Sequence, residues 1–323
     1  MKRSPLAAIC VLFAVCLMLS GCSEYKQIES EADDLRTVGT IGDKEVYFDQ
    51  LRFAVYTCRD AMISAYGEGI FDGEDAPLYL EMLRKQVLAS ITADYATLAL
   101  CEEYGIGLGE PTVLESVDGK LASLVEELGS MRKYKKYLKE NHLTDRTLRF
   151  STEISILQNE LFYVYVDDLG IIENDDDKLY DLIKKEFIKV RHIFIPHSES
   201  DAMQTVTADL ADGASFASLI EKYGSDGEMS ADGIFILKGY MSEEYESVAF
   251  GLDVGEISDV VEDENGVYLI ERLELIPTDI MLNFNRLKDL YQTYTFYSMI
   301  DQKQAELEFI PNDVGVSFLN DPF

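Results

Sequence analysis

Side chains that could act as acids, bases, nucleophiles or metal ligands are unevenly represented in this sequence of 323 residues. Carboxylates are abundant, but there are only three histidines, His142, His192 and His197, and five cysteines without a CxxC pair or a Cys/His cluster. Zinc needs such ligands at close spacing, so the sequence predicts no metal site. His192 lies in an apolar run typical of a strand, where a hydrogen-bonded core histidine and a functional histidine are both open readings. His197, directly after Pro196, is typical of an exposed loop.

The charge of the chain limits its partners. Asp and Glu number 60 against 28 Lys and Arg, which gives a formal net charge of -32. Such a surface repels phosphate backbones, and this excludes nucleic-acid binding. One stretch is strongly basic, and it contains Arg132, Lys133, Lys135, Lys136 and Lys139. A solvated helix face is the simplest explanation of this stretch, and a landing site for an acidic partner or for anionic lipid is the alternative.

The first 22 residues are typical of a secretion signal. Lys2 and Arg3 precede an uncharged apolar run over residues 6–19, which is shorter than the ~20 residues that a spanning helix needs. The Leu-Ser-Gly-Cys sequence that ends at Cys22 resembles the lipobox of bacterial lipoproteins, which implies cleavage before Cys22 and a lipid on its sulfur. An ordinary signal peptide with an incidental cysteine is the alternative. We expect a signal peptide over 1–21, a flexible tether over 22–36, and a lipid anchor on the extracytoplasmic face of a bacterial cell membrane.

Helical patterns dominate residues 37–186. Gly42-Asp43-Lys44 predicts a tight hairpin, and Asp49 is expected to cap a helix that ends near residue 66. Proline at the start and glycine at the end predict helices at about 77–104 and 111–128, and Thr144 is expected to cap another. Cys58 and Cys101 lie in apolar helical patterns, so buried free thiols are expected in preference to a disulfide.

The pattern changes at residue 187. Short β runs at 188–195, 234–237, 257–261 and 267–275 alternate with helices at 201–210, 216–223 and 245–250, which predicts an α+β module over 187–275. Beyond Pro277 a long helix is predicted over 279–307. The predicted fold class is therefore α+β: a mainly helical domain, built from residues 37–186 and 276–323, with an inserted α+β module.

Several segments of this module resemble parvulin-type (PpiC-type) peptidyl-prolyl isomerases. The sequence VRHIFI at 190–195, GASFASL at 213–219 and Ser225-Asp226-Gly227 follow the order of that family. Residues 239–241, 245, 249–252, 255–258 and 266–270 keep its order and nearly its spacing. With the lipobox and the helical domain, the whole chain resembles the extracytoplasmic foldase lipoproteins of the PrsA/SurA type. The resemblance implies a chaperone that acts on unfolded or partly folded exported proteins and needs no cofactor.

This resemblance implies a non-covalent chemistry. An X-Pro bond crosses a barrier of ~20 kcal/mol because amide resonance is lost in the twisted state. A parvulin lowers the barrier by holding the proline ring in an apolar pocket and binding the twisted amide most tightly. Met241, Tyr245 and Phe250 would form the pocket, although core packing is the stronger reading for Phe250. His192 would lie at the floor of the site, in a hydrogen-bond network near Asp226.

The sequence departs from the family at one position of the expected catalytic set. The second family histidine, in a Gly-x-His segment, is Tyr268 here. A phenol can donate a hydrogen bond, but it cannot donate from one nitrogen and accept at the other as imidazole does. Two functions are therefore expected: an isomerase whose activity is weakened by Tyr268, or a holdase chaperone with a degenerate, non-catalytic module.

The acidity of the module constrains its substrate. Residues 187–275 contain 5 Lys and Arg against 19 Asp and Glu, and no basic cluster follows the first strand of the module. Phosphate recognition requires such cations, so phospho-Ser/Thr-Pro specificity is disfavoured. We expect a preference for uncharged or basic residues beside the proline.

Overall fold

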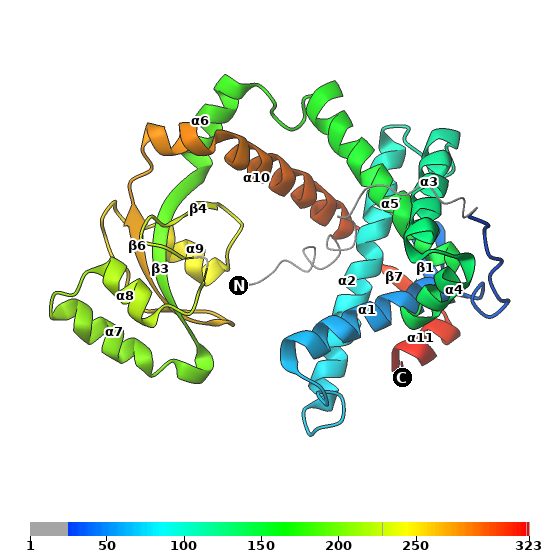
Figure 1. Cartoon of the computed structure of the whole chain (residues 1–323), viewed down its shortest axis with the longest axis horizontal. Helices are drawn as coiled ribbons and strands as arrows, with labels where there is room; N and C mark the ends of the chain where they lie inside the picture. Colours follow the sequence, from blue (N-terminus) through cyan, green and yellow to red (C-terminus); the bar gives the residue numbers. More distant parts are fainter. Residues whose placement is uncertain (1–24, 228, 321, 323) are drawn as a thin grey trace. The chain divides into compact units, whose positions relative to one another are not determined.

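The structure is a computed structural model that describes residues 25–227, 229–320 and 322 (Figure 1). The predicted signal peptide and Cys22 lie outside the described residues. The chain divides into two compact units. Their described parts are residues 172–295 for one unit, and residues 25–171 with 296–320 and 322 for the other. Among the described residues, no helix combines the length and the apolar character needed to cross a bilayer.

A small antiparallel sheet joins the two ends of the helical unit. Its strand order is β2 (Lys44–Tyr47), β1 (Thr37–Ile41), β7 (Phe309–Pro311). Gly42 has φ +60°, as the predicted hairpin between β1 and β2 requires. The sequence did not predict β7, because three residues show no periodicity. Helix α11 (Asp313–Asn320) follows β7 and packs on β1.

Helices make up the rest of this unit. They are α1 (Phe48–Tyr66), α2 (Ala76–Glu103), α3 (Pro111–Leu128), α4 (Met131–Glu140) and α5 (Asp145–Tyr163), which continues into a π-helical turn, η3 (Val164–Asp168). Thr144 caps α5 as predicted, because its hydroxyl accepts a hydrogen bond from the Thr147 N–H. The prediction that Asp49 caps α1 is wrong: Asp49 lies inside the first turn, fully buried. Its carboxylate is instead satisfied by the Thr144 hydroxyl, at 2.6 Å, and by an ion pair with Arg146.

Cys58 and Cys101, the two cysteines among the described residues, are free thiols, as predicted. Cys101 is buried and Cys58 is half-buried. Burial raises the pKa of Cys58 to about 11 and that of Cys101 to about 12, so neither thiol is a reactive thiolate at neutral pH.

The second unit is built on a four-stranded antiparallel sheet of order β4-β3-β6-β5. Its elements follow as α6 (Asp176–Glu186), β3 (Phe187–Pro196), η4 (His197–Glu199), α7 (Ala202–Ala211), α8 (Phe216–Tyr223), β4 (Ile234–Leu237), α9 (Glu243–Ala249), β5 (Val261–Glu262) and β6 (Gly266–Leu273). Helices α7 and α8 pack on one face of the sheet and α9 on the other. The predicted strand at 257–261 is shorter than expected, since only a single bridge from Ile257 to Glu271 precedes β5.

Strand alternation decides which face each β3 and β6 side chain occupies. Ile193 and Ile195 point toward α7 and α8, so His192 and Phe194 lie on the α9 face. Helix α10 (Pro277–Gln304) begins in this unit, where Ile280 and Leu287 pack on Phe187 and Leu237, and its last residues belong to the helical unit. The predicted fold class, a mainly helical domain from both ends of the chain with an inserted α+β module, is confirmed.

Candidate active site

A buried chain of hydrogen bonds centres on His192 in β3. Its Nδ1 atom lies 2.9 Å from the hydroxyl of Tyr245 in α9, and its Nε2 atom lies 3.2 Å from Oδ2 of Asp226. His192 is 2% exposed and Tyr245 is fully buried. Asp226 lies in the loop after α8, and the Ser225 N–H anchors this loop by donating to the Phe194 carbonyl, 2.9 Å away. The family resemblance implied a hydrogen-bond network of His192 with a polar residue near Asp226, and in the structure the nearby polar group is the Asp226 carboxylate itself.

These partners fix the proton positions on the imidazole. An ionised carboxylate can only accept a hydrogen bond, so the tautomer of His192 that fits this geometry donates from Nε2 to Asp226. Nδ1 is then the acceptor, and the Tyr245 hydroxyl donates to it. Burial raises the pKa of Tyr245 well above its usual value, which keeps the phenol protonated and able to donate. The two hydrogen bonds therefore point in one direction: Tyr245 donates to His192, and His192 donates to Asp226.

Tyr268 in β6 forms an aromatic wall beside His192. The register of β3 and β6 places it directly opposite Phe194, and the two ring centroids lie 4.9 Å apart. Its ring also meets those of His192 and Tyr245 edge-on, with centroids 5.4 Å and 5.2 Å away. Burial, and then the nearby Asp263 carboxylate, raise the pKa of Tyr268. Tyr268 thus contributes packing beside His192, while the hydrogen bond to His192 comes from Tyr245.

Asp263 ties the loop before α9 to the loop before β6. It accepts hydrogen bonds from the Ser242 hydroxyl at 2.9 Å and from the Asn265 N–H at 2.8 Å. Burial alone would raise the pKa of Asp263, but these hydrogen bonds outweigh it and hold the pKa below its usual value. Ser242 is also the N-cap of α9, so Asp263 fixes the start of the helix that bears Tyr245.

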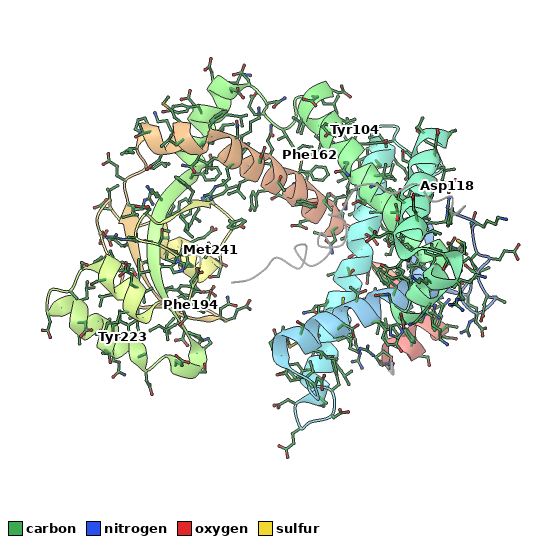
Figure 2. All side chains as sticks on the ribbon, viewed as in Figure 1. Tyr104, Asp118, Phe162, Phe194, Tyr223 and Met241 are labelled. Atoms are coloured by element: carbon green, nitrogen blue, oxygen red, sulfur yellow. The ribbon has the colours of Figure 1, made fainter. Side chains whose placement is uncertain are left out.

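A short loop before α9 presents Met241. The carboxylate of Glu246 accepts hydrogen bonds from the backbone N–H groups of Gly239 and Met241, both at 2.8 Å. Gly239 has φ +91°, and a Cβ at this position would collide with the hydroxyl of Tyr294. Met241 and Phe194 pack against the same buried cluster on the α9 side of the sheet (Figure 2). The loop therefore holds the Met241 side chain in a defined place.

Two hollows flank α9. One, of about 410 Å³, is lined by Lys238, Gly239, Met241, Glu243, Glu246, Ser247 and Phe250. The other, of about 610 Å³, is lined by Glu244, Ser247, Val248, Leu252 and residues 256–261. Met241 and Phe250 are both half-buried, so a ligand in the first hollow would contact them. His192 lines neither hollow and lies behind Tyr245 and Tyr268.

Comparison with known proteins assigns the family. Residues 1–162 match the profile of the SurA-like N-terminal domain, and residues 192–274 match that of the PPIC-type PPIase domain. The chain belongs to the PrsA/SurA-type parvulin foldases.

This chain is similar to several curated proteins that are named as foldases. It is 25% identical over 208 residues to "Foldase protein PrsA" of Oceanobacillus iheyensis, across 62% of this chain and 68% of the relative. It is 22% identical over 279 residues to "Foldase protein PrsA" of Caldanaerobacter subterraneus, across 83% and 82%. A solved structure of PrsA from Bacillus anthracis aligns with a TM-score of 0.40 and 19% identity, covering 67% of this chain and 96% of that one.

The structure of this foldase brings most of the predicted site residues together and separates their roles. His192, Tyr245 and Tyr268 form one buried group with the half-buried Asp226 at its edge, whereas Met241 and Phe250 line the hollow. Tyr245 was expected to contact the proline, but it is fully buried because it lies on the inner face of α9. Sequence analysis assigned no role to Asp263 or Glu246, because nothing in an acidic sequence distinguishes a carboxylate that accepts hydrogen bonds from loop N–H groups from any other acid.

Proposed function

We propose that this protein is a foldase that catalyses cis–trans isomerisation of X-Pro bonds in unfolded or partly folded exported proteins. The observation that carries the proposal is that Met241 and Phe250 line one hollow and also pack on the buried cluster that contains Tyr245, the hydrogen-bond partner of His192. Such a site needs no cofactor, because the reaction breaks no covalent bond.

The site residues divide into substrate-binding and positioning residues. Met241 and Phe250 hold the proline ring and exclude water from the preceding amide. Tyr245, His192, Asp226 and Tyr268 act as positioning residues, since their contacts fix α9 and the loops on both sides of it. The site binds the twisted amide more tightly than either planar form only if its residues keep their positions and do not adjust to the planar forms. The contacts of the positioning residues supply this rigidity. A thousandfold acceleration corresponds to about 4 kcal/mol of such differential binding.

A protease-coupled isomerisation assay tests the proposal. The mature chain from residue 22 with Cys22→Ser is compared with its Met241→Ala variant on an X-Pro peptide. We expect Met241→Ala to lower kcat/KM at least tenfold. Met281→Ala is the matched control, because Met281 lies on α10, is 70% exposed and lines neither hollow. Equal rates for both variants and the parent chain would remove Met241 from the site.

A second candidate function is a holdase that binds unfolded chains without turnover. The observation that favours it is Tyr268, whose phenol stands at the position of a family histidine and makes no hydrogen bond to His192. Under this alternative, His192→Ala and Met241→Ala leave suppression of client aggregation unchanged, and no variant isomerises peptides above background. Gain of activity in Tyr268→His would show that the tyrosine is what limits turnover.

We also propose that the protein is held at the extracytoplasmic face of a bacterial membrane by a lipid on Cys22. The Leu-Ser-Gly-Cys sequence supports this proposal. A diacyl anchor supplies two chains, and burial of each CH₂ contributes ~0.8 kcal/mol. Expression with a radiolabelled fatty acid should label the parent chain and leave Cys22→Ser unlabelled. Label in the Cys22→Ser variant would refute the assignment of the anchor to this residue.

A further inference from the structure

Helix α4 carries a cationic face in a strongly acidic protein. Its buried side chains are Tyr134 and Leu138, which pack toward the other helices. Its exposed side chains include five cations and one acid: Arg132, Lys133, Lys135, Lys136, Lys139 and Glu140. Against a chain charge of -32, this is a local reversal of sign on one face of one helix. We call these five cations the α4 basic face.

Most cations of the α4 basic face have no ion-pair partner among the described residues. In the part of the chain that the structure describes, Lys136 alone of the five forms an ion pair, with Glu140 at 3.3 Å. Arg132 and Lys133 lie in the first turn of α4, where cations oppose the helix dipole, and no acid accompanies them there. Local structure therefore does not account for these cations, and their position favours a partner outside the chain.

The beginning of the described chain is hydrogen-bonded to α5 and contacts α4. The hydroxyl of Tyr25 donates to Asp145 Oδ2 at 2.9 Å, and Arg149 donates to the Tyr25 hydroxyl at 2.9 Å. The Tyr134 hydroxyl donates to the other oxygen of Asp145 at 2.8 Å, and the rings of Tyr25 and Tyr134 meet edge-on with centroids 6.1 Å apart. A segment expected to be a flexible tether is thus held at Tyr25, directly beside α4.

The short spacing from Cys22 to Tyr25 limits the distance between a lipid anchor on Cys22 and Tyr25. Three residues reach about 11 Å at most, even when fully extended. An acyl chain on Cys22 would enter the bilayer, so Tyr25 and α4 would lie within roughly one headgroup layer and one Debye length of the membrane surface.

We propose that the α4 basic face docks on the anionic lipid headgroups of the membrane that holds the protein. This inference rests on the proposed lipid anchor at Cys22 for its biological setting. The charges are complementary, and the tether length places the face at that surface rather than at a distant partner. The rest of the chain is repelled by anionic lipid, so docking through α4 would set one orientation of the helical unit on the membrane.

Vesicle co-sedimentation tests the proposal on the unacylated Cys22→Ser mature chain. Vesicles contain either phosphatidylcholine alone or phosphatidylcholine with 30% phosphatidylglycerol. Near an anionic surface each cation contributes roughly fivefold to binding, so reversal of three should lower partitioning to the anionic vesicles at least ~100-fold. The variant is Arg132→Glu/Lys135→Glu/Lys139→Glu, whose three positions make no ion pair with a described residue. Raising the salt to 0.5 M should also abolish binding by the parent chain.

A matched control separates a local effect from net charge. Lys85→Glu/Lys178→Glu/Lys184→Glu changes the charge by the same amount at exposed positions on α2 and α6, and it should bind like the parent chain. The proposal would be overturned if the α4 variant bound anionic vesicles as well as the parent chain does. It would also be overturned if the parent chain bound neutral and anionic vesicles equally, or if it bound soluble polyglutamate but not vesicles. Because no variant in this assay is acylated, the outcome is independent of lipid attachment at Cys22, which fatty-acid labelling reports separately.

Discussion

The Nδ1 atom of His192 and the hydroxyl of Tyr245 lie 2.9 Å apart, and both side chains are buried behind the hollow that Met241 lines. This hydrogen bond joins β3 to α9, so it connects the sheet to the helix that forms one wall of the hollow. It also fixes the imidazole tautomer, because the other ring nitrogen faces the Asp226 carboxylate. Met241 and Phe250, which line the hollow, pack on the cluster that contains Tyr245, so this buried hydrogen bond supports the wall of the hollow.

Removing the Tyr245 hydroxyl should weaken both stability and activity. In Tyr245→Phe the ring remains, but Nδ1 of His192 loses its donor in a buried setting, which costs about 1–3 kcal/mol. Urea unfolding measures this loss, and the isomerisation rate should fall because the imidazole is no longer held. Tyr240→Phe is the control, since Tyr240 is 53% exposed and its hydroxyl should matter little. A Tyr245→Phe variant as stable and active as the parent chain would contradict the role given to this hydrogen bond.

Two glycines with positive φ should respond differently to alanine. Gly239 and Gly255 have φ of +91° and +86°, so either change costs about 1–2 kcal/mol of backbone strain. An added Cβ at Gly255 meets nothing within 4 Å, whereas at Gly239 it collides with the Tyr294 hydroxyl. Gly239→Ala should therefore cost a further 1–3 kcal/mol or so and lower kcat/KM, because the loop that presents Met241 must shift. Equal losses of stability and activity in the two variants would disprove this reading of the loop.

The residue before the substrate proline should affect turnover through charge. Glu243 and Glu246 line the hollow with Met241, and residues 187–275 carry 19 acids against 5 cations. Peptides with Lys before Pro should be isomerised faster than peptides with Glu, and the difference should shrink as salt is raised. Faster turnover of the Glu-Pro peptide would refute the expected preference.

Asp94 should make the helical unit less stable as the pH rises. It lies half-buried on α2, and no described residue forms an ion pair or hydrogen bond with its side chain. Burial raises the pKa of Asp94 from 3.8 to about 7 in the folded protein. The folded state therefore holds this proton more tightly than the unfolded state, and stability is lost as the pH rises from about 4 to about 7.

The Asp94→Asn variant tests this assignment by thermal unfolding at pH 5 and pH 8. The substitution should stabilise the protein more at pH 8 than at pH 5, because it removes a buried charge that is present only at the higher pH. Glu115→Gln, exposed on α3, is the control for loss of one carboxylate. A gain that is the same at both pH values would show that Asp94 has an ordinary pKa.

The sequence predicted the elements whose signals are local. Pro111 and Gly129 bracket α3, and the alternation of apolar residues placed β3 and β4, because proline, glycine and side-chain periodicity act within a few residues. β7 was missed because its stability comes from pairing with β1, some 270 residues earlier in the chain. Asp49 was misassigned for a similar reason, since its partner Arg146 comes from α5.

In the candidate site, too, the sequence did not predict the contacts of single side chains that depend on distant parts of the chain. The resemblance to parvulins predicted that His192, Asp226, Tyr245 and Tyr268 lie in one region, because the order of the motifs along the chain is kept when the sequences diverge. It could not show that Tyr245 points inward to His192, because this depends on how α9 lies on the sheet. Nor could it show that Asp263 and Glu246 hold the loops around α9, since these contacts involve backbone N–H groups that carry no sequence signal.

The most direct test of this account is the rate of cis–trans exchange of a Lys-Pro peptide, measured by NMR exchange spectroscopy with catalytic amounts of the Cys22→Ser mature chain. We expect exchange well above the uncatalysed rate, and an acceleration at least tenfold smaller for a folded His192→Asn variant. No acceleration by the parent chain, or full acceleration by the His192→Asn variant, would contradict the claim that the His192 network shapes an isomerase site.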